Sequence, residues 1–284
     1  MTQLAPFRPL PEVSPASVWA QRWAHGRQRW RHAHHDGSFD PNAYTVEALP
    51  ERTAGAYIVA NHYSGSYPAA LHRYGLLCAQ RLVGVAVLGV PTSAATLTNV
   101  FPGLEPYRES AVLSRFVLAD EVAANGESWF LARVFHEAAA TGLRGLLSFA
   151  DPVPRRVGDA VVFPGHIGTI YQATNAVFTG RSTPRLLTLL PNGEVLNERA
   201  KSKVRARERG HEAVERRLCA LGANPPRAGQ GGRDWLAQAL DDIGALGLRH
   251  GGNYRYAWAI GDRARRRRTV IVTAALPYPK RVDA

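Results

Sequence analysis

The sequence predicts an α/β fold in which a central sheet is flanked by helices, with a basic helical insertion before the last strands. Three observations support this fold class. Short apolar runs bounded by Gly, Pro or polar residues recur along the chain, as strands do. Segments with helical spacing lie between these runs. The chain has 284 residues, of which 45% are hydrophobic, so it can bury a large core.

Six runs rich in Leu or β-branched residues are the expected strands. They span residues 57–60, 82–90, 111–118, 145–149, 185–190 and 269–275. Such short apolar runs are typical of buried strands.

Four segments are the expected helices. They span residues 128–140, 168–178, 198–218 and 234–246. In the first, Phe130, Val134 and Ala138 recur at helical spacing on one face, and Gly142 ends the helix. The third segment is densely basic in its first half, and Asp234 is expected to cap the fourth.

The expected organisation is a basic N-terminal arm or helix within residues 1–50, followed by one domain over residues 51–284. The basic helical insertion of this domain covers about residues 198–250. The arm contains a segment at 18–35 with His32, His34 and His35. A surface His cluster beside several arginines is more often solvated or close to phosphates than bound to a metal.

Charge points to a polyanionic partner. The chain has 35 Lys and Arg against 23 Asp and Glu, a formal net charge of +12, which favours nucleic acid or an anionic membrane face. The longest apolar stretch, 82–90, is too short to cross a bilayer, and no signal-peptide core is visible, so we expect a cytoplasmic protein. Cys78 and Cys219 are too far apart in sequence to indicate a zinc site or a disulfide framework.

Polar residues at the ends of predicted strands are the first candidates for chemistry. The run 57–60 leads into His62 and Tyr63, and the run 145–149 leads into Asp151. Ligands of open α/β sheets gather at the carboxyl ends of strands. Asp151 precedes a proline, so a role as a turn starter stays open.

A strand, a turn and a helix start follow one another at residues 113–130. This arrangement is typical of anion sites, because the backbone N–H groups and the helix dipole point at the bound group. Ser128 lies near the helix start, where it is either a cap or first-turn residue or a catalytic residue. Tyr171 lies with Thr174 and Asn175 on one side of the next predicted helix.

Several of these motifs together resemble a known family. SRFVLADEV, NGESWFL, SFADP, YQATN and NYRYAW, in this order, resemble the phage Mom family, which is related to the GNAT acyltransferase fold. The resemblance runs from about residue 57 to the C-terminal LPYPK and leaves residues 1–50 and 222–249 uncovered. It implies a mixed central sheet. It also implies an enzyme that transfers a methylcarbamoyl (acetamido) group to the exocyclic amine of adenine in double-stranded DNA, which protects phage DNA from restriction.

The resemblance also implies the site residues. Carried over motif by motif, they are His62, Tyr63, Arg115, Ser128, Asp151 and Tyr171. His62, Tyr63 and Asp151 offer N and O ligands that suit iron, which the resemblance associates with the family. GNAT acetyltransferases carry a glycine-rich turn for the coenzyme A pyrophosphate, and residues 122–127 have only Gly126 there. This argues against acetyl-CoA and leaves the acyl or alkyl donor open.

Two basic segments are the predicted DNA-binding residues, and they fit double-stranded DNA rather than a membrane as the partner. The first set is Arg199, Lys201, Lys203, Arg205 and Arg207, and the second is Arg265, Arg266, Arg267 and Arg268. A large local excess of positive charge repels itself unless a polyanion is bound. A solvated helix and a basic hairpin tip are the alternatives.

Two other functions compete with DNA adenine modification. One is a GNAT-type, CoA-dependent acyltransferase acting on another amine, such as a tRNA base, a protein or a small molecule. The other is a non-catalytic basic DNA-binding protein. The absent pyrophosphate turn argues against the first, and polar residues at several strand ends argue against the second. The oligomeric state stays open, with a dimer as one alternative.

Overall fold

The protein is described here by a computed structural model that covers residues 19–24, 27–32, 39–123, 125–158, 160–163 and 165–280. The chain forms two compact units. Unit 1 consists of Met1–Ala150, Ile167–Gly180 and Tyr254–Ala284. Unit 2 consists of Asp151–His166 and Arg181–Asn253. Both units are therefore built from segments that are separate in the sequence.

Unit 1 contains a seven-stranded sheet in the order β10-β14-β7-β6-β5-β4-β3. The strands are β3 (Tyr44–Ala48), β4 (Ala70–Cys78), β5 (Arg81–Gly89), β6 (Ser110–Leu118), β7 (Gly145–Ala150), β10 (Val177–Arg181) and β14 (Tyr254–Ala259). β6 and β7 pair in parallel, whereas β3 to β6 and the β7–β14 pair are antiparallel. The predicted fold class, a mixed central sheet flanked by helices, is confirmed.

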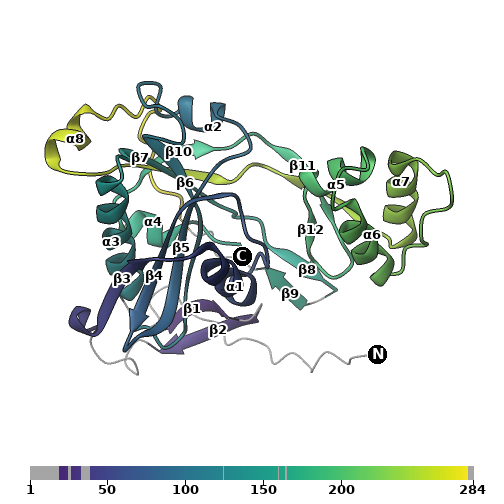
Figure 1. Cartoon of the computed structure of the whole chain (residues 1–284), viewed down its shortest axis with the longest axis horizontal. Helices are drawn as coiled ribbons and strands as arrows, with labels where there is room; N and C mark the ends of the chain where they lie inside the picture. Colours follow the sequence, from purple (N-terminus) through teal and green to yellow (C-terminus); the bar gives the residue numbers. More distant parts are fainter. Residues whose placement is uncertain are drawn as a thin grey trace. The chain divides into compact units, whose positions relative to one another are not determined.

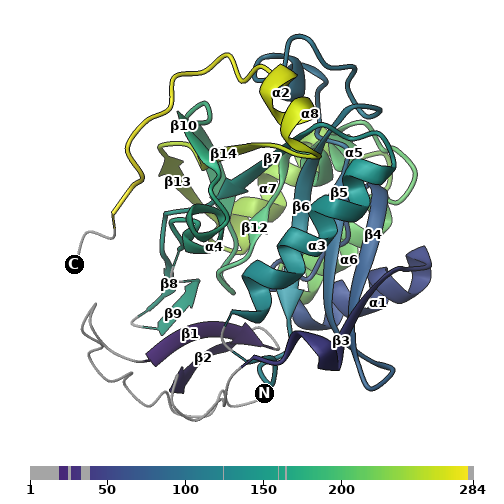
Figure 2. The same cartoon turned by 90° about the vertical axis from the view of Figure 1, so that its left-hand side faces the viewer.

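Helices cover both faces of this sheet (Figures 1 and 2). They are α1 (Glu51–Asn61), α2 (Ala95–Thr98), α3 (Gly126–Ala140), α4 (Thr169–Ala173) and α8 (Arg263–Arg268). α3 connects β6 to β7 and buries Phe130, Leu131 and Val134 in the largest hydrophobic cluster. On the other face, Ala54 and Ile58 of α1 pack in a separate cluster with residues of β5.

Unit 2 has its own sheet and its own core. Its strands are β11 (Arg185–Leu189), β12 (Val195–Leu196) and β13 (Leu246–His250), with a hairpin of β8 (Arg155–Val157) and β9 (Ala160–Phe163). Its helices are α5 (Glu198–Arg205), α6 (His211–Ala220) and α7 (Gly232–Asp242), labelled in Figure 1. Trp235 and Leu236 of α7 pack with Val204 of α5 and Leu218 of α6.

The strand expected at residues 57–60 is wrong, because these residues form the second half of α1. Glu51 lies in the first turn after Pro50, and Ala54 and Ile58, four residues apart, are buried on one side. The strand expected at 269–275 is also wrong. That segment has no regular structure, although the Val272 N–H donates to the Val100 carbonyl at 3.1 Å.

Other boundaries differ from the predictions. The helix expected at 168–178 ends at Ala173, and β10 follows it. α7 starts at Gly232, and its N-cap is Gly231 rather than Asp234. β3 precedes residue 50 and already belongs to the central sheet.

The N-terminal arm contains strands rather than the helix that was one expectation. β1 (Trp19–Ala24) and β2 (Arg27–His32) pair in antiparallel fashion. His34 and His35 lie outside the described residues. Within the described ranges, no helix combines the length and the apolar character that a membrane crossing requires.

Candidate functional site

The loop that follows α1 forms a polar network around His62. His62 is the C-cap residue of α1, and it is buried. The backbone N–H of Ser64 donates to His62 Nδ1 at 3.1 Å, and Ser64 Oγ lies 2.9 Å from the same nitrogen. Because Nδ1 is an acceptor here, the proton of a neutral His62 ring lies on Nε2. Ser66 Oγ lies 3.4 Å from Ser64 Oγ and extends the network.

Arg115 of β6 joins this network. Its Nε donates to the Ser66 carbonyl, and its Nη2 donates to Ser66 Oγ, both at 3.0 Å. Burial lowers the pKa of Arg115, and the electrostatic effect of Tyr63 opposes this shift. The Tyr63 ring lies 4.2 Å from the His62 ring and is 41% exposed. The structure thus brings together three predicted site residues, His62, Tyr63 and Arg115, in unit 1.

Ser64 and Ser66 were not among the predicted site residues. Both belong to the polar run that follows the apolar segment of α1, and this run was the available signal. Ser66 could not be linked to Arg115 from the sequence, because 49 residues separate them. Figure 2 shows α1, which precedes the loop with Ser64 and Ser66, and β6, which carries Arg115, as separate elements of unit 1.

The parallel strands β6 and β7 pair over only three positions. Their register begins at Ser110 and ends at Val112 of β6. One residue further on, the Leu113 carbonyl accepts a hydrogen bond from Ser148 Oγ of β7 at 3.0 Å. A side-chain hydroxyl therefore takes the place of a backbone N–H at the point where regular pairing stops.

Tyr171 of α4 is a core residue of unit 1. Its ring lies 5.4 Å from the rings of both Tyr256 and Trp258. Burial raises the pKa of Tyr171, and a hydrogen bond with Ser148 opposes the shift. Packing accounts for these aromatic contacts, and the contact with Ser148 places the phenol beside the end of the β6–β7 pairing. The catalytic role of Tyr171 stays a prediction.

Ser128 lies in the first turn of α3. The N-cap is Asn125, which has a left-handed backbone with φ of 74° and makes no side-chain cap bond. Ser128 Oγ donates to the Asn125 carbonyl at 3.0 Å. Ser128 is therefore a first-turn residue of α3 and not its N-cap.

We expect Ser128→Ala to lower the free energy of unfolding by about 1 kcal/mol, because one local hydrogen bond is lost at a solvent-accessible position. Denaturant unfolding measures this change. The activity that the family resemblance implies should stay within a few-fold of the unchanged protein in the same variant. A loss of several orders of magnitude in this activity, with the same small change in stability, would place Ser128 among the reacting groups.

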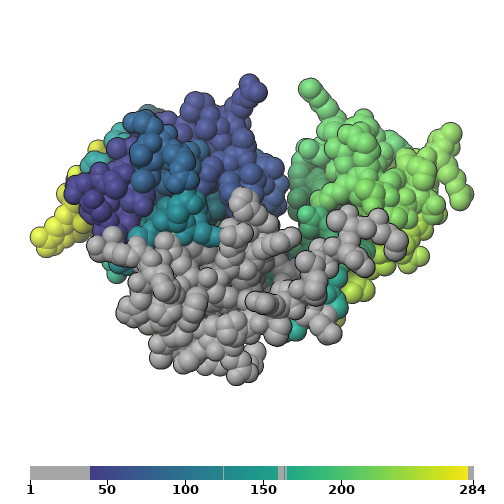
Figure 3. All heavy atoms as spheres, turned by 90° about the horizontal axis from the view of Figure 1, so that it is seen from below, coloured from purple at the N-terminus to yellow at the C-terminus, as the bar shows by residue number. Residues whose placement is uncertain are grey.

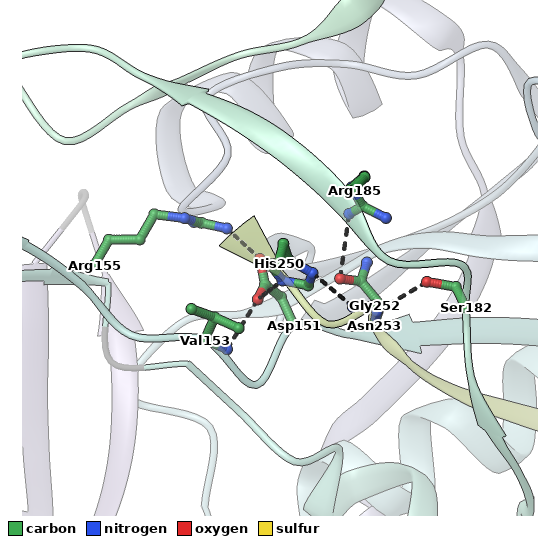
Figure 4. Close-up of polar contacts among 8 residues, drawn as sticks. All are labelled: Asp151, Val153, Arg155, Ser182, Arg185, His250, Gly252 and Asn253. Atoms are coloured by element: carbon green, nitrogen blue, oxygen red, sulfur yellow. Dashed lines mark hydrogen bonds and ion pairs between the residues drawn. The ribbon is translucent and has the colours of Figure 1, made fainter. Parts of the chain in front are cut away.

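Asp151 lies in unit 2 at the centre of a hydrogen-bonded cluster (Figure 4). Asp151 Oδ1 accepts from the Val153 N–H at 3.0 Å and lies 2.8 Å from His250 Nε2. The Gly252 N–H donates to His250 Nδ1 at 3.0 Å, so the His250 proton lies on Nε2 and is donated to Asp151. Asp151 Oδ2 forms an ion pair with Arg155.

The Asp151 cluster is largely buried, and an aromatic ring packs against its arginine. The side chains of Asp151 and Arg155 are only 13% and 12% exposed. The Arg155 guanidinium carbon lies 4.3 Å from the centre of the Phe163 ring. Burial lowers the pKa of His166 to about 4, and Asp151 opposes this shift.

His250 and Arg155 were missed in the sequence. The rule that selected Asp151, a polar residue at the end of a strand, applies equally to His250, which ends β13. The sequence does not predict the strand at 246–250, so His250 does not stand out as a residue at a strand end. Their contacts fix the Asp151 carboxylate through both oxygens, which is the arrangement of a structural buried pair.

The predicted iron ligands do not form a metal centre in the described part of the chain. It contains no group of three or more His, Cys, Asp or Glu side chains that could hold a metal. His62 Nδ1 accepts from Ser64, and both oxygens of Asp151 have partners within unit 2. These residues do not fit the predicted iron site.

The predicted DNA-binding cations of α5 differ in exposure. Lys201 is buried, and its Nζ donates to Thr188 Oγ1 at 2.9 Å. Arg199 pairs with Glu208 at 2.6 Å, and Arg205 pairs with Glu198 at 3.6 Å. These ion pairs compensate part of the charge that was expected to require a polyanion. In α8, by contrast, all the arginines are exposed.

Fold and contacts together define a mixed α/β protein with a polar cluster of His62, Tyr63 and Arg115 beside a parallel strand pair. The chain belongs to the Mom protein family, whose sequence profile matches residues 43–280. Comparison with curated protein sequences gives no match.

Solved structures with a similar chain path include several acetyltransferases. One is an acetyltransferase from Bacillus subtilis in complex with CoA, with 7% identity, a TM-score of 0.33, and coverage of 77% of this chain and 99% of that one. Another is a GNAT family acetyltransferase from Elizabethkingia anophelis with acetyl-CoA bound, with 9% identity, a TM-score of 0.33 and the same coverages of 77% and 99%. At this level of similarity they support no statement about activity.

Proposed function

We propose that this protein is a DNA-modifying transferase that adds a methylcarbamoyl (acetamido) group to the exocyclic amine of adenine in double-stranded DNA. Membership of the Mom family over residues 43–280 is the observation that carries this proposal. The formal net charge of +12 supports a polyanionic substrate. Protection of phage DNA from restriction is the biological role that follows.

In this proposal the cluster of His62, Tyr63 and Arg115 receives the adenine. An adenine amine inside a duplex is reached by extruding the base, which then stacks on an aromatic ring. Tyr63 is 41% exposed and offers such a ring next to His62. The hydrogen bonds of Arg115 go to neutral oxygens of residues 66 and 114, so its positive charge supports binding of a phosphate or another anion.

The proposed chemistry requires a base. When the adenine amine bonds to the transferred carbon, the bond between that carbon and its donor breaks, the donor leaves with the bonding electrons, and the amine loses one proton. His62 Nδ1 accepts from the Ser64 N–H at 3.1 Å, and Ser64 Oγ lies 2.9 Å from the same nitrogen. The Ser64 hydroxyl can therefore pass a proton to Nδ1 while it takes one from the amine. The donor of the group is not assigned.

Plasmid DNA from cells that express the protein tests this function. We expect liquid chromatography and mass spectrometry of its nucleosides to show a modified deoxyadenosine. The plasmid should also resist restriction enzymes whose sites contain adenine. Plasmid from cells expressing His62→Ala is the matched control and should contain ordinary deoxyadenosine.

The competing acyltransferase makes a different prediction for the same cells. Unmodified DNA together with an acylated tRNA base, protein or small amine would replace the proposed function. Soluble expression of the protein has to be shown alongside, because an insoluble protein would also leave DNA unmodified.

A further inference from the structure

Two basic segments of this chain differ in how their charge is compensated. Residues 198–215 hold six Lys or Arg side chains and four Glu side chains, whereas residues 262–268 hold five Arg and one Asp. Four of the six cations in the first segment form ion pairs with glutamates, namely Arg199, Lys201, Arg205 and Arg207. The positive charge around α5 is thus largely balanced within unit 2.

The single acid beside α8 serves the helix itself. Asp262 is the N-cap, and its Oδ1 accepts from the Arg265 N–H at 2.7 Å. The side chains of Arg265 and Arg266 donate to the carbonyls of Ala139 and Gly261 at 3.0 and 2.6 Å. Arg265 Nε also lies 4.0 Å from Asp262 Oδ2 in an exposed ion pair, whereas the side-chain acceptor of Arg266 is a neutral carbonyl.

Three further arginines of α8, Arg263, Arg267 and Arg268, are exposed. Within the described ranges, their side chains form no hydrogen bond and no ion pair, although Arg268 is close enough to Asp262 to help lower the pKa of that carboxyl. Figure 3 shows the yellow C-terminal segment that contains α8 protruding from the described surface of unit 1. Such a concentration of exposed guanidinium groups on one short helix repels itself unless an anion is bound.

A groove lies directly beside α8 in unit 1. It has a volume of about 970 Å³ and is lined by residues of α3, of β14 and the turn after it, and of α8, together with Ile271, with Thr174 and Asn175 after α4, and with Val177 at the start of β10. Its apolar wall includes Phe135 and Trp258, and its polar rim includes His136, Asn175 and Arg265. Several residues that line it on α3 and β14 are alanines, whose small side chains do not fill the groove.

We propose that α8 and this groove together bind the sugar-phosphate backbone of DNA, and that α5 contributes little. This inference rests on the proposed function, because it takes DNA as the substrate. α8 has six residues and is about 9 Å long, so its cations span two or three successive phosphates of one strand. Guanidinium groups bind phosphate oxygens in pairs, and the groove takes the deoxyribose of the adjoining nucleotide.

Two charge-matched triple variants test the cationic part. One is Arg263→Gln, Arg267→Gln and Arg268→Gln, and the other is Arg199→Gln, Lys203→Gln and Arg205→Gln. The dissociation constant for a short fluorescent DNA duplex is measured at several salt concentrations. We expect the α8 variant to lower the slope of log affinity against log salt by about two to three, and the α5 variant to lower it by less than one. The opposite order, or equal changes, would overturn the proposal.

A second pair of variants tests the groove. Ala132 is exposed and lines the groove, so Ala132→Trp should fill it and weaken DNA binding about tenfold without changing the salt slope. Ala173→Trp is the control, because Ala173 is also exposed in unit 1 but does not line the groove. Circular dichroism confirms that both variants are folded. An unchanged affinity in folded Ala132→Trp would remove the groove from the site.

The binding assay is independent of catalysis. If the α8 variant lowers the salt slope as expected but the unchanged protein does not modify DNA, the proposed function is wrong and this inference remains. Conversely, the unchanged protein could modify DNA while the α8 variant keeps the same slope of log affinity against log salt. This result would overturn the inference about α8 and leave the proposed function intact. Vesicles containing phosphatidylserine are tested in parallel, and an α8 variant that loses only vesicle binding would assign the surface to a membrane and overturn the inference.

Discussion

A His62→Ala variant should lose DNA modification by about 10² to 10⁴-fold, the usual contribution of a general base. In the proposed reaction His62 Nδ1 takes up the proton of the adenine amine through Ser64. Its removal leaves the hydroxyl without the acceptor that lies 2.9 Å away. Modified deoxyadenosine per microgram of plasmid, measured at equal protein levels, gives the size of the loss. Ser64→Ala should show a smaller loss, because water can replace the hydroxyl.

Asn61→Ala is the matched control for His62→Ala. Asn61 is adjacent in the chain, and its Nδ2 donates to the Tyr57 carbonyl at 2.9 Å at the end of α1, outside the network. This variant should lose stability at the helix end and keep its activity. If His62→Ala and Asn61→Ala lose activity equally, the effect comes from the fold of the loop, and the role of His62 as a base is wrong.

Asp151→Ala should destabilise unit 2 by about 3 to 5 kcal/mol, because it leaves the nearly buried Arg155 cation without its carboxylate. It also removes the acceptor of the fully buried His250 side chain. Asp151→Asn should cost less, since an amide oxygen can still accept from His250. Thermal and denaturant unfolding measure both changes. Loss of modification should follow the loss of folded protein.

The exposed ion pair of Arg81 and Glu121 provides the control. Its side chains are 67% and 50% exposed, so Glu121→Ala should cost less than about 1 kcal/mol. A stable, folded Asp151→Ala protein without DNA modification would contradict the structural role and return Asp151 to the catalytic residues implied by the family resemblance.

Much of the central sheet could be predicted because its strands are continuous apolar runs. The expected strand at 82–90 corresponds to β5, and the one at 111–118 corresponds to β6. The prediction for residues 57–60 was wrong because the β-prone residues Tyr57, Ile58 and Val59 were considered without Ala54, which lies four residues before Ile58 on the same side of the helix. Residues 269–275 look like a strand, but a strand requires a partner, and sequence alone does not reveal a partner.

The candidate site was predicted in part for the same reason. His62 and Tyr63 stand out because polar residues follow an apolar run directly. The contact between Ser66 and Arg115 and the contact between Asp151 and His250 connect residues 49 and 99 positions apart. Long-range contacts of this kind depend on the sheet topology of each unit. Charge compensation around α5 likewise became visible only when the partners of its cations were known.

The discontinuous course of the chain has a consequence for how the protein is made. β14 lies between β10 and β7 in the sheet, and Tyr254 pairs with Ala150, so all of residues 151–253 are synthesised before β7 receives this partner. Pairing of residues so distant in sequence is slow to form.

Unit 2, whose helices and sheet lie almost entirely in Arg181–Asn253, emerges from the ribosome complete while β7 still has an open edge. An open apolar strand edge is a point of aggregation. The nascent chain is therefore most exposed to misassembly in the interval between synthesis of β7 and synthesis of β14.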